Sequence, residues 1–322
     1  MCVTCGCSDN SETTISNLET GEVVEIKGES HEHHHTHTLP DGSVITHSHN
    51  HESTHSHTHT LPDGTVITHS HSHSNGDSNS EASQVHAQIH GTTISLEQDI
   101  LAKNNLIAAQ NRGWFRGRNI LALNLVSSPG SGKTTLLTRT IHDLKEQLPI
   151  YVIEGDQETA NDAKKIQETG CEVVQINTGT GCHLEASMVE RALQQLNPSL
   201  NSLVMIENVG NLVCPALFDL GESAKVVILS VTEGEDKPIK YPHMFRASDI
   251  MILTKIDLLP YVQFDVERCI QYAKQVNPKI HVFKVSAVTG EGLGNWYGWL
   301  HSQSQRLHAS TEVQIPQASP AL

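Results

Sequence analysis

Between residues 91 and 308, seven short apolar segments alternate with segments that have the spacing of amphipathic helices. This alternation limits the fold more than any other feature, because apolar strands separated by helices are typical of a mainly parallel sheet covered on both faces. We therefore predict an α/β fold whose ligand binds at the carboxyl ends of the strands. The predicted strands are 119–126, 149–154, 171–176, 202–207, 225–231, 249–254 and 280–285, and the predicted helices are 132–147, 159–169, 184–196, 263–276 and 292–306.

A further helix is predicted to open this domain. Ser95 and Gln98 have the spacing of a capping box, in which two side chains pair with unbonded backbone N–H groups at the start of a helix. A partial apolar stripe follows, made of Ile100, Leu101, Ile107 and Ala108.

The first ninety residues differ from the rest in composition. They contain 16 of the 22 histidines and one lysine against twelve acidic residues, and residues 1–113 contain no Phe, Tyr or Trp. A segment this polar cannot bury enough apolar surface to fold alone. We therefore predict four regions: a Cys-rich tip at 1–8, a disordered His-rich arm at 9–90, a globular domain at 91–308 and a flexible tail at 309–322.

The arm contains an internal repeat, because HTHTLPDGSVITHSH at 35–49 returns as HTHTLPDGTVITHSH at 57–71. Pro-Asp-Gly between two such segments is typical of a turn. Each copy is therefore predicted to form a small hairpin, with His35 and His37 near His47 and His49 in the first copy. An isolated hairpin is marginal in water, so we expect metal bridging to stabilise it.

Composition argues against several classes of protein. The formal net charge is −15 and no basic stripe is present, which argues against a nucleic-acid partner. No apolar run reaches the ~18 residues that a membrane-spanning helix needs, and residues 1–30 lack the layout of a secretory signal. The seven cysteines, an odd number, then indicate reduced thiols in the cytoplasm that serve as metal ligands or catalytic groups.

The strongest motif follows the predicted strand at 119–126. Residues 127–134 read SSPGSGKT and lead into a helix, which is the context that a phosphate-binding P-loop requires. Lys133 is expected to contact the β- and γ-phosphates, and the Thr134 hydroxyl is expected to bind Mg²⁺. Ser127 stands where glycine is usual, but no N–H donor is lost. The predicted phosphate-binding residues are Gly130, Ser131, Gly132, Lys133, Thr134 and Thr135.

A second motif indicates which base is bound. Thr254-Lys255-Ile256-Asp257 follows a buried strand and is similar to the Asn-Lys-x-Asp motif of GTP-binding proteins. An ionised Asp257 accepts hydrogen bonds from guanine N1–H and N2–H₂, a pair of donors that adenine does not offer. Lys255 would lie along the ring, and the loop at Ser286 and Ala287 would contact guanine O6. These residues predict GTP as the nucleotide.

Two carboxylates follow predicted strands at the same edge. Asp156 belongs to the sequence EGDQ, and Glu207 begins ENVGN, at the position of the Asp-x-x-Gly element of G proteins. We predict that Thr134, Asp156 and Glu207 bind or flank Mg²⁺, and that Lys133, Asp156 and Glu207 act in catalysis. The alternative is that either carboxylate only caps a helix or pairs with a lysine.

Cysteines at the start of the chain form one candidate metal site. Cys2, Cys5 and Cys7 place three thiolates within six residues, and the α-amine is near enough to be a fourth ligand. Three sulfurs and one nitrogen suit square-planar Ni²⁺ or tetrahedral Zn²⁺.

A second candidate metal site combines distant residues. Cys182 and His183 are predicted at the same sheet edge as Cys214, which follows Glu207 by seven residues. If the intervening loop moves between the GTP and GDP forms, the metal geometry at Cys214 changes with it. The two remaining cysteines of the seven, Cys171 and Cys269, are predicted to be core residues instead, because a free cysteine often packs as a small apolar side chain.

Together these motifs resemble the HypB family, the nickel-incorporation GTPases of NiFe-hydrogenase maturation. The resemblance covers the Cys-rich tip and roughly residues 93–306. Its motifs are ALNLVSSPGSGKTTLL, IEGDQET, TGTGCHLEA, IENVGNLVCP, TEGEDKPIKYPHMF and TKIDLLP.

The resemblance implies a dimerising P-loop GTPase that delivers nickel. It implies a tight nickel site in the tip and a weaker nickel or zinc site at Cys182, His183 and Cys214 near the dimer interface. It also implies a homodimer promoted by GTP or metal, a HypA-type metallochaperone as partner, and transfer of nickel to the hydrogenase large subunit. The presence of both tip and arm suggests storage alongside delivery.

Two alternatives stay open at this point. A urease-type nickel GTPase shares the loop class and a His-rich start, although the CVTCGC tip and the Cys182-His183 pair argue against it. The other alternative is a nickel or zinc storage buffer whose nucleotide binding is vestigial.

Overall fold

The structure is a computed structural model that describes the backbone of residues 13–26, 33–38, 44–49, 56–60, 66–70, 82–157 and 161–312. The chain divides into two compact units, of which one is Gly28–Ser95 and the other combines Met1–Lys27 with Leu96–Leu322. The predicted tip at 1–8 and nearly all of the predicted tail lie outside the described residues.

The larger unit is built on a nine-stranded sheet. Its strands are β1 (Thr13–Asn17), β2 (Val23–Ile26), β7 (Leu121–Ser127), β8 (Ile150–Asp156), β9 (Glu172–Asn177), β10 (Leu203–Glu207), β11 (Ala224–Ser230), β12 (Ile250–Thr254) and β13 (His281–Lys284). The strand order is β13-β12-β11-β7-β10-β8-β9-β1-β2, and all pairs from β13 to β9 are parallel. The predicted α/β fold with a mainly parallel sheet is therefore confirmed.

Helices cover both faces of this sheet. They are α1 (Ala82–Gly117), α2 (Lys133–Leu144), α3 (Asn161–Gln167), α4 (Ala186–Leu196), α5 (Lys237–Lys240), α6 (Pro242–Ala247), α7 (Val266–Val276) and α8 (Leu293–Glu312), with 3-10 turns η1 (Cys214–Ala216) and η2 (Ile256–Tyr261). In β10, Leu203 and Met205 pack in the core that α2, α3 and α8 share, whereas Val204 and Ile206 pack with α1 and α4. Alternate residues of one strand thus face opposite layers. No helix in the described part of the chain is long and apolar enough to cross a membrane.

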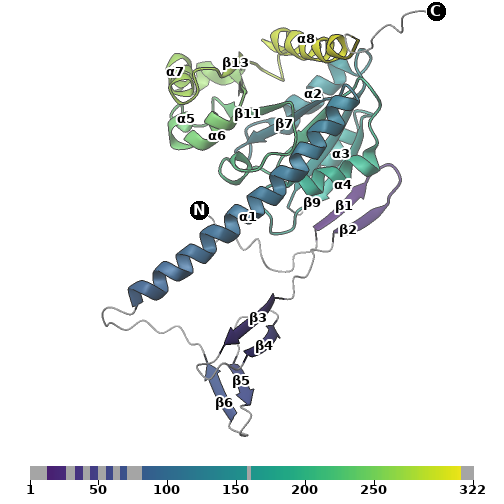
Figure 1. The fold of residues 1–322 in the computed structure, drawn as a ribbon. Helices are drawn as coiled ribbons and strands as arrows, with labels where there is room; N and C mark the ends of the chain where they lie inside the picture. Colours follow the sequence, from purple (N-terminus) through teal and green to yellow (C-terminus); the bar gives the residue numbers. More distant parts are fainter. Residues whose placement is uncertain are drawn as a thin grey trace, which may run out of the picture. The chain divides into compact units, whose positions relative to one another are not determined.

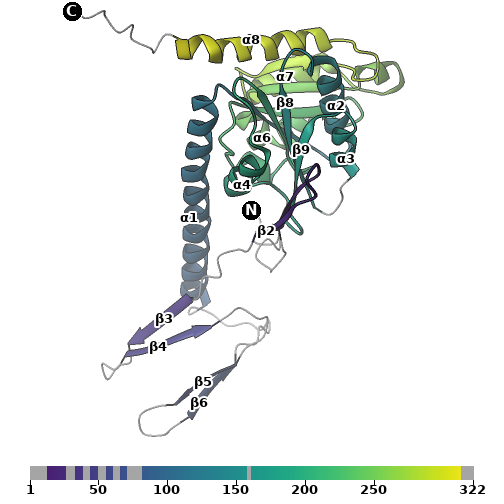
Figure 2. The ribbon, with the colours of Figure 1, turned by 90° about the vertical axis from the view of Figure 1, so that its right-hand side faces the viewer.

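A hairpin from the predicted arm is part of the main sheet. Figures 1 and 2 show β1 and β2 beside β9, and β1 pairs with β9 antiparallel, with Thr14 opposite Asn177. Ile15 is fully buried against α4 and its neighbouring strands, and Gln167 Nε2 donates to Leu18 O at 2.9 Å. The prediction that residues 9–90 form one disordered arm is therefore wrong for 13–26, because an open sheet edge supplies the partner that a short apolar hairpin lacks alone.

The smaller unit contains the two predicted repeat hairpins. Strand β3 (His33–Thr38) pairs with β4 (Val44–His49), and β5 (Ser56–Thr60) pairs with β6 (Val66–Ser70), both antiparallel. In the first hairpin His35 lies opposite His47 and His33 opposite His49, so the register brings histidine positions together across the strands. The Pro-Asp-Gly turns lie outside the described residues.

The helix that opens the domain differs from its prediction. Helix α1 begins at Ala82, so Ser95 and Gln98 lie inside it and form no N-terminal capping box. The capping-box pattern is only four residues long, and it marks a helix start only when the preceding residues leave the helical conformation. Here residues 82–94 continue the helix in the N-terminal direction, through Gly91.

Helices α2 and α8 are joined by Asp143. Its Oδ2 accepts hydrogen bonds from the Tyr297 hydroxyl and from Arg139 Nε, each at 2.8 Å. Partial burial raises the pKa of Asp143, but hydrogen bonds from His142, Arg139 and Tyr297 outweigh this and lower that pKa to about 2.

We expect Asp143→Asn to lower the free energy of unfolding at pH 7 by about 1 kcal/mol, as is typical for a partly exposed charged hydrogen-bond acceptor. A carboxyl group whose pKa is lowered by folding stabilises the protein above its unfolded pKa and loses this effect as the pH falls. The difference between variant and parent in urea unfolding should therefore shrink below about pH 4. The control is Asp236→Asn, which removes a carboxylate that forms an exposed ion pair with Lys240. A difference that is constant with pH would contradict this account.

A candidate nucleotide and metal site

The predicted phosphate loop has the expected strand-loop-helix geometry. Strand β7 ends at Ser127 and α2 begins at Lys133, with Gly132 at its N-cap. Gly130 and Gly132 have φ values of 76° and 90°, which side chains other than glycine rarely adopt. Ser127 is the last residue of the strand and is buried, so its extended backbone does not need the glycine that is usual there.

The structure brings three of the predicted site residues together. Glu207, at the end of β10, accepts hydrogen bonds through Oε1 from Lys133 Nζ at 2.9 Å and from Thr134 Oγ1 at 2.7 Å. Its side chain is only 1% exposed. Asp156 ends the neighbouring strand β8, and α2 carries Thr135 directly after Thr134. All of these groups stand at the carboxyl edge of the sheet, as predicted.

A further buried carboxylate lies at this edge. Glu154 is the register partner of Glu207 on β8 and is 2% exposed. Burial raises the pKa of Glu154 to about 9, and the nearby Glu207 and Asp156 carboxylates add to the effect. The Oε2 atoms of Glu154 and Glu207 have no hydrogen-bond partner among the described residues. Unpaired carboxylate oxygens beside a P-loop hydroxyl fit a Mg²⁺ ion, which prefers oxygen ligands.

Residues that the sequence reasoning did not single out hold the phosphate loop in shape. Glu233 Oε1 accepts from Ser131 Oγ at 2.8 Å and from Ser230 N at 3.0 Å. Lys237 Nζ lies 3.2 Å from both Glu233 Oε2 and Ser128 Oγ. The motif TEGEDKP carries both residues, but a contact between segments a hundred residues apart leaves no local pattern in the sequence.

The predicted base-binding residues lie on adjacent loops. Lys255 Nζ donates to Gly130 O at 2.7 Å, and Asp257 is the second residue of the 3-10 turn η2, which begins at Ile256. Ile256 N donates to Val285 O at 3.3 Å, which places this turn beside the loop of Ser286 and Ala287. Thr254, where the usual motif has asparagine, donates through Oγ1 to Ser131 O at 2.6 Å and so ties this segment to the phosphate loop.

The second predicted metal site is assembled from two separate loops. Cys182 Sγ lies 3.0 Å from Cys214 Sγ and 3.6 Å from His183 Nδ1, and one ligand atom from each residue lies within 4.8 Å of the others. Neither cysteine forms a disulfide. Ligand bonds of ~2.0–2.3 Å would let one ion contact all three atoms. The Asn211 side chain donates to Cys182 O at 3.2 Å and holds the two loops together.

The surroundings of His183 favour the neutral form of its imidazole. Its ring packs against the Phe218 ring at a centroid distance of 3.9 Å with 35° between the ring planes, and burial lowers the pKa of His183 to about 4. Nε2 has no hydrogen-bond partner among the described residues, and the Glu185 carboxylate lies 3.9 Å from it. A neutral imidazole is the form that binds metal.

The remaining cysteines agree with their predictions where they are described. Cys171 and Cys269 are buried, and burial raises the pKa of each thiol to about 12, which makes them unreactive core residues. Cys2, Cys5 and Cys7 lie outside the described residues, so a metal site in the tip stays a prediction.

A P-loop followed by base-recognition loops on a parallel sheet defines a nucleotide-binding protein, and comparison with known proteins places it more narrowly. Residues 121–284 match the family described as CobW/HypB/UreG, nucleotide-binding domain. The chain is thus a P-loop nucleotide-binding protein of this GTPase family.

Similar proteins narrow the family further. The chain is 58% identical over 226 residues to the hydrogenase maturation factor HypB of Azotobacter chroococcum mcd 1, covering 70% of this chain and 74% of that protein. It is 44% identical over 344 residues to HypB of Cupriavidus necator, covering 93% and 88%. The crystal structure of HypB from Helicobacter pylori in complex with nickel matches with a TM-score of 0.59 and 36% identity, over 67% of this chain and 99% of that chain. The chain belongs to the HypB family of hydrogenase maturation factors.

We expect Glu233→Gln to weaken nucleotide binding about fivefold, which is the effect of losing roughly one hydrogen bond or ion pair in the loop's support. The uncharged amide keeps the size of the side chain but loses the ion pair with Lys237. Titration with a fluorescent guanine nucleotide measures this affinity. Asp236→Asn, three residues along the same segment, serves as control. Equal affinities of Glu233→Gln and the parent would show that Glu233 does not support the loop.

Proposed function

We propose that this chain is a GTP-hydrolysing nickel chaperone that binds nickel and delivers it during hydrogenase maturation. The observation that carries the proposal is that one short loop has a phosphate-loop contact at its start and a candidate metal ligand at its end. It begins at Glu207, which contacts Lys133 and Thr134, and it ends at Cys214, whose sulfur lies 3.0 Å from that of Cys182. A phosphate-dependent contact and a metal ligand therefore belong to the same short segment.

The roles in hydrolysis follow from the contacts of the phosphate loop. Backbone N–H groups at the start of α2, together with Lys133, bind the β- and γ-phosphates. Thr134, Asp156 and Glu207 would hold Mg²⁺, which would neutralise phosphate charge there. Arrival of a phosphate transfers Lys133 from Glu207 to the nucleotide, and Glu207 then orients the attacking water. We infer a slow intrinsic rate, as in molecular switches.

Guanine is the base that the adjoining loops favour. Asp257 offers two carboxylate oxygens to the paired donors of guanine, and Lys255 covers the ring from its contact with Gly130 O. The backbone at Ser286 and Ala287 supplies a donor for O6.

Nickel is the cargo in this proposal, with zinc as a competing ion. Two thiols and one neutral imidazole suit either metal. The tip, with Cys2, Cys5 and Cys7, is a second site that can exchange metal with the first. The register of β1 supports this exchange, because β1 begins with Thr13 beside the carboxyl end of β9. Cys7 precedes Thr13 by six residues, which span about 20 Å of extended chain at most.

Partners are proposed on the same basis. The apolar side chains of Val213 and Leu217 flank the Cys214 segment and are 47% and 58% exposed. Apolar groups in this position favour a second copy of the chain, so we propose a homodimer that GTP or metal promotes. A HypA-type metallochaperone and the hydrogenase large subunit are the proposed acceptors of nickel.

We expect Lys133→Ala to abolish GTP turnover, because the loop then loses the cation that binds the β- and γ-phosphates. Phosphate release at saturating GTP is the measurement, with Lys145→Ala as the surface-lysine control. Turnover equal to that of the parent would show that the measured release is contamination and would favour the storage buffer with vestigial nucleotide binding.

Deletion of residues 31–75 tests the storage role of the arm. This deletion removes both repeats and keeps β1, β2 and α1. We expect fewer nickel ions per chain at pH 7.5, little difference below the imidazole pKa of ~6.5, and unchanged GTP turnover, because only imidazole ligands are lost. Equilibrium dialysis measures the stoichiometry. Loss of turnover would mean that the repeats are part of the catalytic fold.

A further inference from the structure

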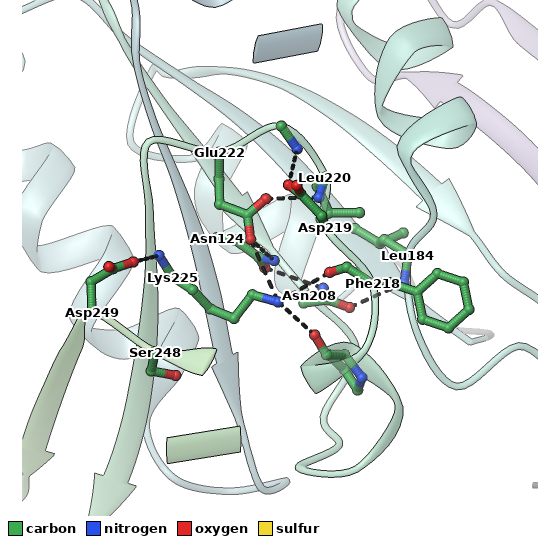
Figure 3. Close-up of polar contacts among 12 residues, drawn as sticks. Asn124, Leu184, Asn208, Phe218, Asp219, Leu220, Glu222, Lys225, Ser248 and Asp249 are labelled. Carbon is green, nitrogen blue, oxygen red and sulfur yellow. Dashed lines mark hydrogen bonds and ion pairs between the residues drawn. The ribbon is translucent and has the colours of Figure 1, made fainter. Parts of the chain in front are cut away.

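A buried polar network, which we name the Asn208–Lys225 network, lies next to both loops of the Cys182, His183 and Cys214 site. Its four members are Asn124, Asn208, Glu222 and Lys225, and each side chain is at most about 7% exposed. None of them is a proposed ligand of nucleotide or metal. Figure 3 shows their contacts.

Asn208 forms one end of the network. Its Oδ1 accepts hydrogen bonds from Leu184 N at 3.1 Å and from Val209 N at 3.0 Å. Leu184 directly follows His183, and Asn208 directly follows Glu207. A single side chain therefore joins the backbone beside one metal ligand to the strand end that contacts Lys133.

Lys225 forms the other end. Its Nζ donates to Pro215 O at 2.7 Å and to Phe218 O at 3.0 Å. Pro215 directly follows Cys214, and the Phe218 ring packs against the His183 ring at a centroid distance of 3.9 Å. A buried ammonium group is costly unless its N–H groups are paired, so Lys225 fixes these two carbonyls in the position that satisfies it.

Asn124 and Glu222 connect the two ends. Asn208 Nδ2 donates to Asn124 Oδ1 at 3.2 Å, and Asn124 Nδ2 donates to Glu222 Oε1 at 3.1 Å. The same Glu222 oxygen lies 3.6 Å from Lys225 Nζ. Polar contacts thus run without a gap from Leu184 to Pro215. Asn124 belongs to β7, the strand that leads into the phosphate loop.

Space for movement lies beside the Lys225 end. An open surface pocket of about 280 Å³ is lined by Ala216 and Leu217 of the Cys214 segment and by Lys225, Asp219 and Arg112. The segment can therefore shift without compressing the core, which a close-packed interior would resist.

We propose that Asn208 and Lys225 are positioning residues for the metal site, and that the network transmits the nucleotide state from Glu207 to both halves of that site. This proposal rests on the proposed function. A contiguous set of contacts is a physical route for coupling only if breaking it changes the coupling. The test therefore replaces Asn124, at the centre of the network, and Lys225, at its end, in separate variants.

The parent for the test is the full chain with Cys2→Ser, Cys5→Ser and Cys7→Ser. In this protein a thiolate-to-nickel absorption band reports the Cys182 and Cys214 site, because histidine ligands give no such band. Nickel affinity is measured with GDP and with a non-hydrolysable GTP analogue. We expect the two affinities to differ at least threefold in the parent.

Three variants test the proposal, with a matched control. Lys225→Met should weaken nickel binding at least tenfold with either nucleotide and shift the absorption band, and Lys225→Arg should restore part of both. Asn124→Leu should keep the affinity with GDP within about threefold but bring the ratio between nucleotides to about one. The control is Lys145→Met, because Lys145 also donates to a backbone carbonyl, Thr169 O, but at an exposed position. This variant should leave the nickel affinities, their ratio and the absorption band unchanged.

The outcomes separate this proposal from the proposed function. A nucleotide ratio in Asn124→Leu equal to that of the parent overturns the network as the route. Parent-like nickel affinity and band position in Lys225→Met overturn its positioning role. A ratio of one in the parent itself overturns the coupling in the proposed function. If Lys225→Met does not fold, as judged by its Tm, Glu222→Gln tests the same end of the network. We expect this variant to lose nickel affinity at least threefold. Nickel affinity equal to that of the parent would contradict the positioning role.

Discussion

The Glu207 carboxylate at the end of β10 is the contact on which the site depends. It accepts hydrogen bonds from Lys133 and Thr134, the same two side chains that a nucleotide and its metal ion need. In the proposed mechanism, binding a phosphate therefore changes the contacts of Glu207 itself. Because Asn208 and the loop to Cys214 follow it in the chain, this change begins at the point where the metal-bearing segment is attached.

Burial strengthens the electrostatic effect of a change in the contacts of Glu207. Glu154 and Glu207 lie side by side with almost no exposure to water, and burial together with neighbouring carboxylates raises the pKa of Glu154 to about 9. Charges in such a place interact more strongly than at a surface. The proposed metal site on the other loops is also largely buried, with the His183 ring packed against Phe218. Hydrogen bonds hold the backbone segments of both sites, and we propose that a shift in one segment is passed on to the other.

Much of the fold was predictable because its signals are local. Apolar strands, the Gly-Lys-Thr loop and the Cys182-His183 pair each occupy a few consecutive residues, and the structure places them as predicted. Two errors came from context. The sequence predicts that residues 13–26 belong to the arm because the composition of that region is polar, but Ile15 is buried at a sheet edge that composition does not reveal. Ser95 has the pattern of a helix start yet lies inside α1.

The parts of the site that the sequence did not reveal are contacts between distant segments. Glu233 supports Ser131 across a hundred residues, and Lys225 holds the carbonyl after Cys214. A lysine or glutamate in isolation is most often a surface residue, so only the folded chain shows which of them is buried and what it contacts.

The central claim is that the nucleotide state alters the environment of the metal bound at Cys182, His183 and Cys214. X-ray absorption at the nickel edge tests this most directly, in the full chain with serine at the three tip cysteines. The account predicts that the number of sulfur neighbours or the nickel–sulfur distance differs between the GDP form and a GTP-analogue form. Identical spectra in the two forms would contradict it.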